Sequence, residues 1–384
     1  MTSPSSSPCA LAGRCGGCPW IGSPLAEQRA RRVEALRRAW AQAGLDPATL
    51  SGLTLQPAGD LGLRDRADLS LRRDGAGLTI GLRSLDGDEL VDLPTCPVQS
   101  PALAASYALL RADPPPLLTR AGLRLRVGPE GQRGLWLDAA NAELKALLDE
   151  GAWLSRQLDQ GVVVEAGQKH KRVRPGEDGR PRLGKPEVLP WSLTLMGDGT
   201  TPVFTAVSGF TQPGMAANLV LVDAVRRAAR AGGVQRWLEL GAGAGNLTLM
   251  LAGEGWQVAA VELDPVARQG LEAGAIAAGC EDRIRLARGN LQRVDEALAA
   301  EAALAEGLLV DPPRSGVGSL VPTLALLPPD RRPAVIVHVS CWSESFAADT
   351  ARLLDLGYTL ERIEGVDQFP HTPQAEWVAL LRRG

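Results

Sequence analysis

Apolar and polar residues alternate with a period of two between Leu69 and Leu93, a pattern typical of strands that bury one face. The apolar positions form three short runs, at residues 69–71, 78–82 and 91–93. Asp74-Gly75 and Asp86-Gly87 separate these runs, and both dipeptides favour tight hairpin turns. The pattern therefore predicts an antiparallel meander. A later segment, from Arg174 to Pro186, is rich in proline, glycine and charge and is expected to be a loop.

A different period marks the segment from Pro24 to Gly44. Its apolar residues recur near helical spacing, at Leu25, Val33, Leu36 and Trp40. The spacing predicts an amphipathic helix, and Gly44 is suited to end it. Residues 1–8, mostly serine, threonine and proline, are expected to form a flexible tail.

From about residue 204 the pattern repeats a strand, a glycine-rich turn and a helix. Strands are predicted at 237–240, 258–261, 308–310 and 335–339, and a helix begins after the glycine-rich turn at Asn246. Such alternation predicts a doubly wound parallel sheet, whose ligand binds at the carboxyl ends of the strands. We therefore expect an α/β protein with an α+β domain at residues 1–203 and a second domain at 204–384. The helix at 24–44 can also pack on the second domain.

Composition narrows the function classes. The chain has 384 residues, enough for two domains, and 22% of them are charged. No apolar run reaches the roughly 18 residues that a membrane span requires, so we expect no membrane role. The net charge of −3 gives no general attraction to nucleic acid, which leaves local basic patches as the means of binding RNA. Two candidate patches are Arg29, Arg31, Arg32, Arg37 and Arg38, and Lys169, Lys171, Arg172 and Arg174.

Four cysteines have the spacing of metal ligands. Cys9, Cys15 and Cys18 are followed by the distant Cys96, and two glycines between Cys15 and Cys18 allow a tight backbone turn. Four thiolates suit either a tetrahedral zinc or an iron-sulfur cluster, and spacing does not separate the two. Disulfides are the alternative, but the cysteine usage favours a reducing cytosol.

Polar residues follow the predicted strands of the second domain. Glu262 ends the second strand, where a carboxylate can accept the ribose hydroxyls of a nucleoside cofactor such as S-adenosylmethionine. Asp311 and Cys341 follow two later strands. A thiol before a helix can titrate low, although an inert buried cysteine is the alternative. Glu376 lies in an apolar segment, either as a tuned acid or base or as an edge-strand charge.

Together these residues resemble the RNA uracil-C5 methyltransferase family. The resemblance rests on the cysteine pattern with Cys96-Pro97, the Asp311-Pro-Pro-Arg motif, Ser340-Cys341, and Phe369-Pro-His-Thr with Glu376. It is closer to the iron-sulfur branch that makes 5-methyluridine in 23S rRNA, without the β-barrel RNA-binding domain that many members carry before the cysteines. One difference is Trp342-Ser343, where the family usually has Asn-Pro.

The resemblance implies a Rossmann-like S-adenosylmethionine methyltransferase domain preceded by an α+β domain with a [4Fe-4S] cluster on the four cysteines. It implies that Cys341 attacks C6 of uracil, that Glu376 removes the C5 proton and that Asp311 contacts uracil or cofactor. The remaining implied cofactor contacts are Gln212, Gly241, Asn246, Glu262 and Asn290. We expect a cytoplasmic monomer that acts on 23S rRNA. The alternatives are the same reaction on the T-loop of tRNA and a non-catalytic, metal-stapled RNA-binding protein.

Overall fold

The computed structural model describes residues 7–384, so the start of the expected tail, residues 1–6, lies outside the described part. The chain divides into two compact units, and each is built from more than one segment. Of the described residues, the first unit contains 7–23, 60–192 and 202–215, and the second contains 24–59, 193–201 and 216–384. The single expected boundary after residue 203 falls inside strand β11 (Gly199–Thr205), which pairs with β10 (Leu189–Met196).

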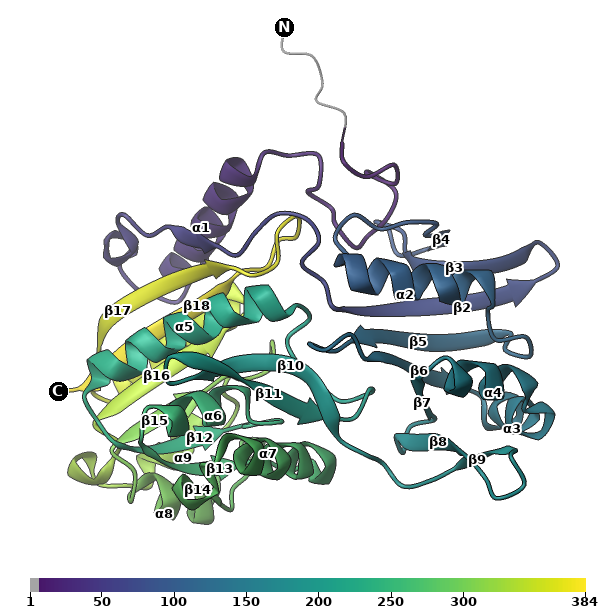
Figure 1. The fold of residues 1–384 in the computed structure, drawn as a ribbon. Coiled ribbons are helices and arrows are strands. Elements are labelled where there is room, and N and C mark those ends of the chain that lie inside the picture. Colours follow the sequence, from purple (N-terminus) through teal and green to yellow (C-terminus); the bar gives the residue numbers. More distant parts are fainter. Residues whose placement is uncertain (1–6) are drawn as a thin grey trace, which may run out of the picture. The chain divides into compact units, whose positions relative to one another are not determined.

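The first unit is a sheet with the strand order β4-β3-β2-β5-β6-β7-β8-β9 among the described residues (Figure 1). Its strands are β2 (Arg66–Asp74), β3 (Gly77–Arg83), β4 (Leu90–Asp92), β5 (Arg120–Val127), β6 (Arg133–Ala139), β7 (Val162–Ala166), β8 (Lys171–Pro175) and β9 (Pro181–Leu183). The antiparallel meander predicted from the period-two pattern is β2-β3-β4. Apart from the parallel pair β6-β7, neighbouring strands are antiparallel.

Three helices cover one face of this sheet: α2 (Pro101–Ala112), α3 (Asn141–Glu150) and α4 (Ala152–Asp159). Leu103 of α2, Leu147 of α3 and Trp153 of α4 pack in one buried cluster with Leu71 and Leu123 of the strands. Among residues 7–384, no helix of this unit packs on the other face of the sheet. The side chains on that face alternate along the strands with the buried leucines.

The expected loop from Arg174 to Pro186 is partly a hairpin, so that prediction was wrong in part. Arg174 of β8 pairs with Arg182 of β9, and Gly179 takes a positive φ of 76° in the turn. Pro181 begins β9, which is the last strand of the sheet. Proline has no N–H to donate to a neighbouring strand. It is tolerated at such a position because one side of an edge strand has no neighbour that needs this donor.

The second unit is a sheet in the order β1-β17-β18-β16-β15-β12-β13-β14. Its strands are β1 (Leu55–Pro57), β12 (Arg236–Leu240), β13 (Gln257–Val261), β14 (Ile284–Leu286), β15 (Gly307–Val310), β16 (Val335–Ser340), β17 (Tyr358–Asp367) and β18 (Glu376–Arg383). Its helices are α1 (Leu25–Gln42), α5 (Met215–Gly232), α6 (Asn246–Gly253), α7 (Pro265–Ala278), α8 (Glu296–Ala302), α9 (Leu320–Ala325) and α10 (Ser343–Asp355).

Helices cover both faces of this second sheet. On one face α5, α6 and α7 bury Val225, Leu249 and Ala275 against the strands. On the other face α1, α8, α9 and α10 do the same, and the ring of Trp40 lies 6.0 Å from that of Phe346. The buried faces form the three-layer core of a doubly wound α/β domain. No helix among residues 7–384 combines the length and the apolar composition that a membrane span needs.

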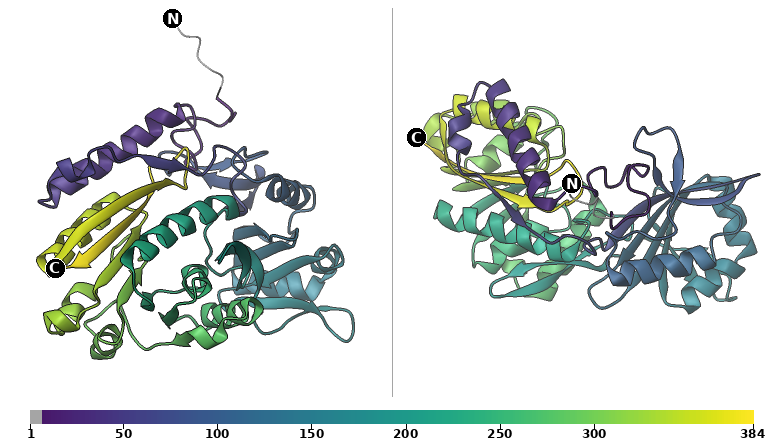
Figure 2. Two further views of the ribbon diagram at one scale, coloured as in Figure 1. Left: turned by 60° about the vertical axis from the view of Figure 1, so that its left-hand side comes forward. Right: turned by 90° about the horizontal axis from the view of Figure 1, so that it is seen from above.

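Helix α1 belongs to the second unit although it lies among first-unit segments in the sequence, and Figure 2 shows it beside β17 and β18. Arg32, 1% exposed, donates to Asp367 Oδ1 over 2.8 Å and to the carbonyl of Thr372 over 2.8 Å. Arg29 donates to Asp367 Oδ2 over 2.8 Å. These two arginines of the first candidate RNA patch therefore hold α1 to the end of β17 and to the chain that follows it.

Candidate functional site

The carboxyl ends of four parallel strands of the second unit meet at one edge of the sheet. Leu240 of β12 is in register with Val261 of β13 and with Val310 of β15, and Val310 is in register with His338 of β16. The chain winds outward from β12 through β13 to β14 and, in the other direction, from β15 to β16. The reversal lies between β12 and β15, where doubly wound sheets bind ligands.

The turn after β12 is shaped by its glycines. Gly241, Gly243 and Gly245 have φ values of +73°, +57° and +90°, which favour glycine. A Cβ on Gly245 would lie 2.6 Å from Leu271 Cδ1. The N–H groups of Gly241 and Ala242 both donate to the carbonyl of Val261, over 2.9 and 3.0 Å. The turn is thus fixed to the neighbouring strand, with its backbone close to the switch point.

Glu262 lies directly after β13, beside this turn. Its Oε2 accepts from the N–H of Gly243 over 2.8 Å, and its Oε1 accepts from the N–H groups of Leu263 and Asp264 over 2.6 and 2.7 Å. A carboxylate has about four lone-pair positions, so hydroxyl groups can still donate to it. The three backbone bonds fix the orientation of the predicted ribose-binding carboxylate.

Asn246 and Asn290 differ in how their side chains are used. Asn246, the first residue of α6, exchanges two side-chain amide hydrogen bonds with Asn218 of α5, over 2.8 and 2.9 Å. Its amide is therefore engaged within the protein and holds the start of α6. Asn290 lies in the loop after β14, where its Oδ1 accepts from the N–H of Gln292 over 2.8 Å and its Nδ2 remains able to donate.

Cys341 and Glu376 are brought together by the antiparallel strand β18. Ser340 of β16 is in register with Trp377 of β18, and the two strands are antiparallel. The residues one position further along, Cys341 after β16 and Glu376 at the start of β18, therefore lie side by side. Glu376 is 3% exposed, and its Oε2 has no hydrogen-bond partner among residues 7–384. A carboxylate oxygen with no partner can accept a proton. The pair predicted to be nucleophile and base therefore shares one corner of the sheet edge.

Burial changes the acidity of the carboxylates at this edge. Burial raises the pKa of Asp311, which follows β15, to about 6. The pKa of Glu376 lies well above its ordinary value, because the side chain is buried and because the negative charge of Asp311 is nearby. Two buried carboxylates so close together resist being ionised at the same time, so the pair retains a proton to higher pH than either would alone.

Arg314, the last residue of the Asp-Pro-Pro-Arg motif, lowers the pKa of Cys341, which the buried, acidic surroundings raise. The pKa of the Cys341 thiol is raised to about 11, chiefly by burial and also by the charges of Glu376 and Asp311. A charge interaction and a hydrogen bond from Arg314 act in the opposite direction and lower it. The guanidinium carbon of Arg314 lies 5.2 Å from the ring centre of Trp342. The motif was noted in the sequence, but the contact of Arg314 with Cys341 was missed.

Trp342-Ser343, the pair that differs from the family pattern, has partners in the structure. Trp342 packs under the guanidinium of Arg314, and the hydroxyl of Ser343 accepts from the indole Nε1 of Trp377 over 3.1 Å. Trp377 directly follows Glu376 and is fully buried. The two residues therefore connect the start of α10 to the arginine and to the strand that carries the predicted base.

Glu239 is a second residue that the sequence reasoning missed. It lies within β12, is 3% exposed and accepts a hydrogen bond from the Thr248 hydroxyl of α6. Its pKa is raised to about 8, chiefly by burial and also by the neighbouring charges of Asp311 and Glu262, whereas the hydrogen bond from Thr248 lowers it. A carboxylate in an otherwise apolar predicted strand was the available signal.

The four predicted metal ligands lie in the first unit. All are free thiols. The backbone of Cys15 pairs with that of Ser84, just after β3. The pKa of Cys18 is raised to about 12, chiefly by burial and also by the charges of Cys96, Cys15 and Cys9. A Cβ on Gly16 would lie 2.8 Å from the carbonyl oxygen of Ser84. Glycine is thus needed where the cysteine segment meets β3.

The thiols are near enough to affect one another, but they are not assembled as a metal site. In the part of the chain from residue 7 onward, no three or more His, Cys, Asp and Glu side chains form a group able to hold a metal ion. The charge of Arg64 lowers the pKa of Cys18, so a cation lies beside the thiols. Four thiolates are the soft ligands that an iron-sulfur cluster requires, and a neighbouring cation would balance the negative charge of such a cluster.

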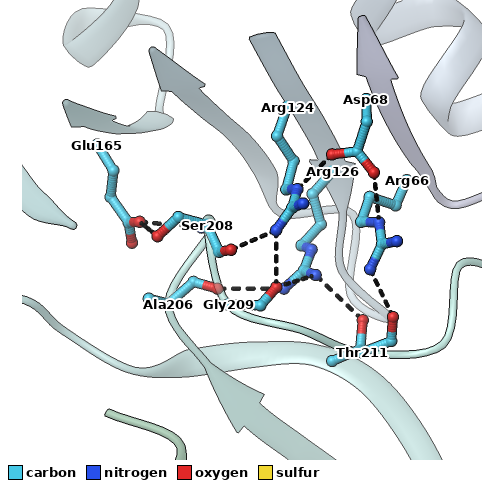
Figure 3. Close-up of polar contacts among 9 residues, drawn as sticks. All are labelled: Arg66, Asp68, Arg124, Arg126, Glu165, Ala206, Ser208, Gly209 and Thr211. Carbon is cyan, nitrogen blue, oxygen red and sulfur yellow. Dashed lines mark hydrogen bonds and ion pairs between the residues drawn. The ribbon is translucent and has the colours of Figure 1, made fainter. Parts of the chain in front are cut away.

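The segment before Gln212 is also in the first unit, held by arginines of β2 and β5 (Figure 3). Arg126 donates to the carbonyls of Ala206 and Gly209 over 3.1 and 2.9 Å, Arg124 donates to the carbonyls of Ser208 and Gly209, and Arg66 donates to that of Thr211 over 2.6 Å. On the other side, Glu165 of β7 accepts from the N–H groups of residues 207 and 208, over 2.7 and 3.0 Å. The backbone is thus fixed up to residue 211. The role of Gln212 stays a prediction.

Known proteins resemble the chain along nearly its whole length. Residues 203–384 match the tRNA (uracil-5-)-methyltransferase family model. An uncharacterised RNA methyltransferase of Bdellovibrio bacteriovorus is 36% identical over 381 residues, which cover 98% of this chain and 95% of the relative. The 23S rRNA (uracil(1939)-C(5))-methyltransferase RlmD of Chromohalobacter salexigens is 30% identical, and the match covers 98% of this chain and 76% of that protein.

A solved structure agrees in fold. The tRNA (uracil-54, C5)-methyltransferase of Pyrococcus abyssi, determined with S-adenosyl-L-homocysteine, superposes with a TM-score of 0.67 at 20% identity, over 95% of this chain and 85% of that one. The second unit thus has the Rossmann-like fold of S-adenosylmethionine-dependent methyltransferases. The chain belongs to the RNA (uracil-5-)-methyltransferase family, and it is an enzyme of that class.

Proposed function

We propose that this enzyme methylates C5 of uridine in 23S rRNA through a covalent bond between Cys341 and C6 of the base. The observation that carries the proposal is the placement of Cys341 beside Glu376, with Asp311 and Arg314 close by, at the sheet edge where this fold binds ligands.

The nucleophile activates the base. C5 of uracil is too weak a nucleophile to accept a methyl group unaided. In the proposed reaction the thiolate of Cys341 forms a bond to C6, the C5–C6 double bond opens, and its electrons form an enolate with nucleophilic carbon at C5. Arg314 favours the reactive thiolate by charge and hydrogen bond.

The second half of the reaction needs a base. C5 takes the methyl group of S-adenosylmethionine, which leaves as S-adenosylhomocysteine, and C5 then carries both a methyl group and a proton. Glu376 removes that proton, the C5–C6 double bond re-forms and the Cys341 thiolate is expelled. The raised pKa of Glu376 supports this role, because a base of higher pKa binds the abstracted proton more strongly.

The cofactor would be held at the switch point. We propose that the backbone of the Gly241 turn approaches its methionine end, that Glu262 accepts its ribose hydroxyls and that the free donor of Asn290 faces its adenine. Asn246 acts through the position of α6, since its side-chain amide is bound to Asn218. Asp311 and Gln212 complete the proposed contacts to uracil and cofactor.

We also propose that Cys9, Cys15, Cys18 and Cys96 hold a [4Fe-4S] cluster, which supplies a rigid support for the surrounding segments when it is bound. Their mutual effect on pKa and the cation at Arg64 support this proposal. Anaerobically purified protein should carry about four iron and four sulfide ions per chain, and a Cys18→Ser variant should lose most of them. Zinc in place of iron, or equal iron content in both proteins, would contradict the proposal.

The substrate is tested with transcripts that carry no modifications. We expect methyl-labelled S-adenosylmethionine to give labelled 5-methyluridine in 23S rRNA, detected by nucleoside mass spectrometry, and none in tRNA. The match to the 23S rRNA enzyme supports this choice. Label in tRNA alone would select the T-loop alternative. A Cys341→Ala variant is the control, and labelling by that variant would refute the covalent mechanism.

A further inference from the structure

The sheet of the first unit presents one face that its helices do not cover. Strands β2, β3 and β5 place arginines at alternating positions on this face: Arg66, Arg72, Arg83, Arg120, Arg124 and Arg126. Asp68 and Asp74 of β2 and Asp138 of β6 are the acidic residues that these strands and β6 contribute to the same face. The face is therefore basic, although the whole chain has a net charge of −3.

The protein covers one half of this basic face with its own chain. Segment 206–211 lies over Arg124 and Arg126, and its carbonyl oxygens take up their guanidinium donors (Figure 3). Val207 of this segment also packs with Val163 of β7 and with Trp191. In this half the arginines are bound to protein.

The other half is hollow. Ser70, Gly122 and Asp138 lie in register on three neighbouring strands and line a depression of about 630 Å³, together with Arg72, Arg83 and Arg120. The small residues leave space between the arginines. This volume is within the roughly 300–1,000 Å³ usual for ligand sites.

Two of these arginines face each other across a strand pair. Arg72 of β2 is directly in register with Arg120 of β5. Like charges at such positions destabilise a sheet, because their Cβ atoms are only about 5 Å apart. The side chain of Arg72 has Asp74 at 3.2 Å, whereas the side chain of Arg120 forms no hydrogen bond or ion pair with any residue from 7 to 384. No residue from 7 to 384 neutralises the charge of Arg120, so the repulsion between the two arginines is not fully compensated within the described chain. A bound anion would relieve it.

We propose that this hollow binds the ribose-phosphate backbone of the RNA substrate, remote in sequence from the methyl-transfer residues. Arg72, Arg83 and Arg120 contact phosphate oxygens, which accept the guanidinium fork well. The carboxylate of Asp138, which has one neighbouring donor in Gln168 at 3.3 Å, accepts a ribose 2′-hydroxyl. That contact favours RNA over DNA. The inference rests on the proposed function only in taking RNA as the substrate.

The test measures binding of the full-length protein to an unmodified 23S rRNA transcript between about 50 and 200 mM salt. Replacing Arg72, Arg83 and Arg120 together by glutamine should lower the slope of log affinity against log salt by about 2, since each phosphate contact on single-stranded nucleic acid contributes about 0.7. Affinity at the lowest salt should fall at least about tenfold. Lys145→Gln, on the helix-covered side, removes one charge that is 76% exposed and should leave the slope unchanged.

A second variant tests the ribose contact. Asp138→Ala should weaken RNA binding and leave binding of DNA with the same sequence unchanged. An unchanged salt slope in the arginine variant, or an equal effect from Lys145→Gln, would overturn the inference. The proposed function would still stand in that case, provided that the wild type methylates the RNA. A wild type that binds RNA with the expected slope but transfers no methyl group would instead refute the proposed function alone.

Discussion

Replacing Arg314 should make Cys341 less reactive. In the native site the pKa of the thiol is about 11, so at pH 8 about one thiol in a thousand is ionised. A hydrogen bond from a charged group contributes about 1.5–3 kcal/mol, which corresponds to about one to two pH units on a thiol. Arg314→Gln should therefore slow thiolate chemistry at pH 8 by about 10- to 100-fold.

The assay follows alkylation of Cys341 by iodoacetamide from pH 7 to 10, measured by mass spectrometry of the peptide that contains it. Cys280 is fully buried and serves as an internal control for unfolding. Trp342→Ala keeps the arginine but removes the ring beneath it, and a cation above an aromatic ring contributes about 0.5–2 kcal/mol. This variant should lie between wild type and Arg314→Gln. Identical pH profiles for all three proteins would refute the assigned role of Arg314.

Three further predictions concern the second unit. Glu376→Gln should methylate C5 but fail to remove its proton, so a protein-RNA adduct that survives denaturing gel electrophoresis should accumulate. Its absence, with RNA binding intact, would argue against Glu376 as the base. Asp367→Asn breaks a buried ion pair with Arg32 and should lower the free energy of unfolding by about 3–5 kcal/mol in urea titrations, whereas Arg31→Gln on the exposed side of α1 should change it by less than about 1 kcal/mol. Equal effects would contradict the burial argument. Glu239 has a folded pKa near 8 against an ordinary 4.5, so the folded state binds the extra proton and stability should fall as pH rises from about 5 to 8. Glu239→Gln should reduce that fall by up to about 1.4 kcal/mol per pH unit, and an unchanged pH dependence would refute the assignment.

Local patterns in the sequence carried much of the fold. The meander followed from alternation around Leu69 and Ile80, and the doubly wound sheet followed from repeated strands and glycine turns. Helix α1 was found by its period, and it ends at Gln42, just before Gly44. Its place in the second unit depends on Arg32 meeting Asp367, 335 residues away, and such a contact leaves no local signal.

The candidate site was predicted in its residues more than in its geometry. The resemblance to the family gave Cys341 and Glu376 as a nucleophile and its base, but the contact that joins them depends on β18 inserting antiparallel between β16 and β17. Two other features could not be predicted for the same reason: the contact of Arg314 with the thiol, and the basic hollow around Arg120. Both depend on which residues meet across strands or loops, and spacing along one segment does not give that information.

The covalent step is tested most directly with RNA that contains 5-fluorouridine. In this base fluorine replaces the hydrogen at C5, and Glu376 cannot abstract it. The reaction should therefore stop after methyl transfer, with Cys341 still bonded to C6. Incubation with S-adenosylmethionine should give one protein-RNA adduct per chain, and mass spectrometry should place the nucleotide on the peptide that contains Cys341. The same adduct from a Cys341→Ala variant, or attachment at another residue, would contradict the mechanism proposed for this enzyme.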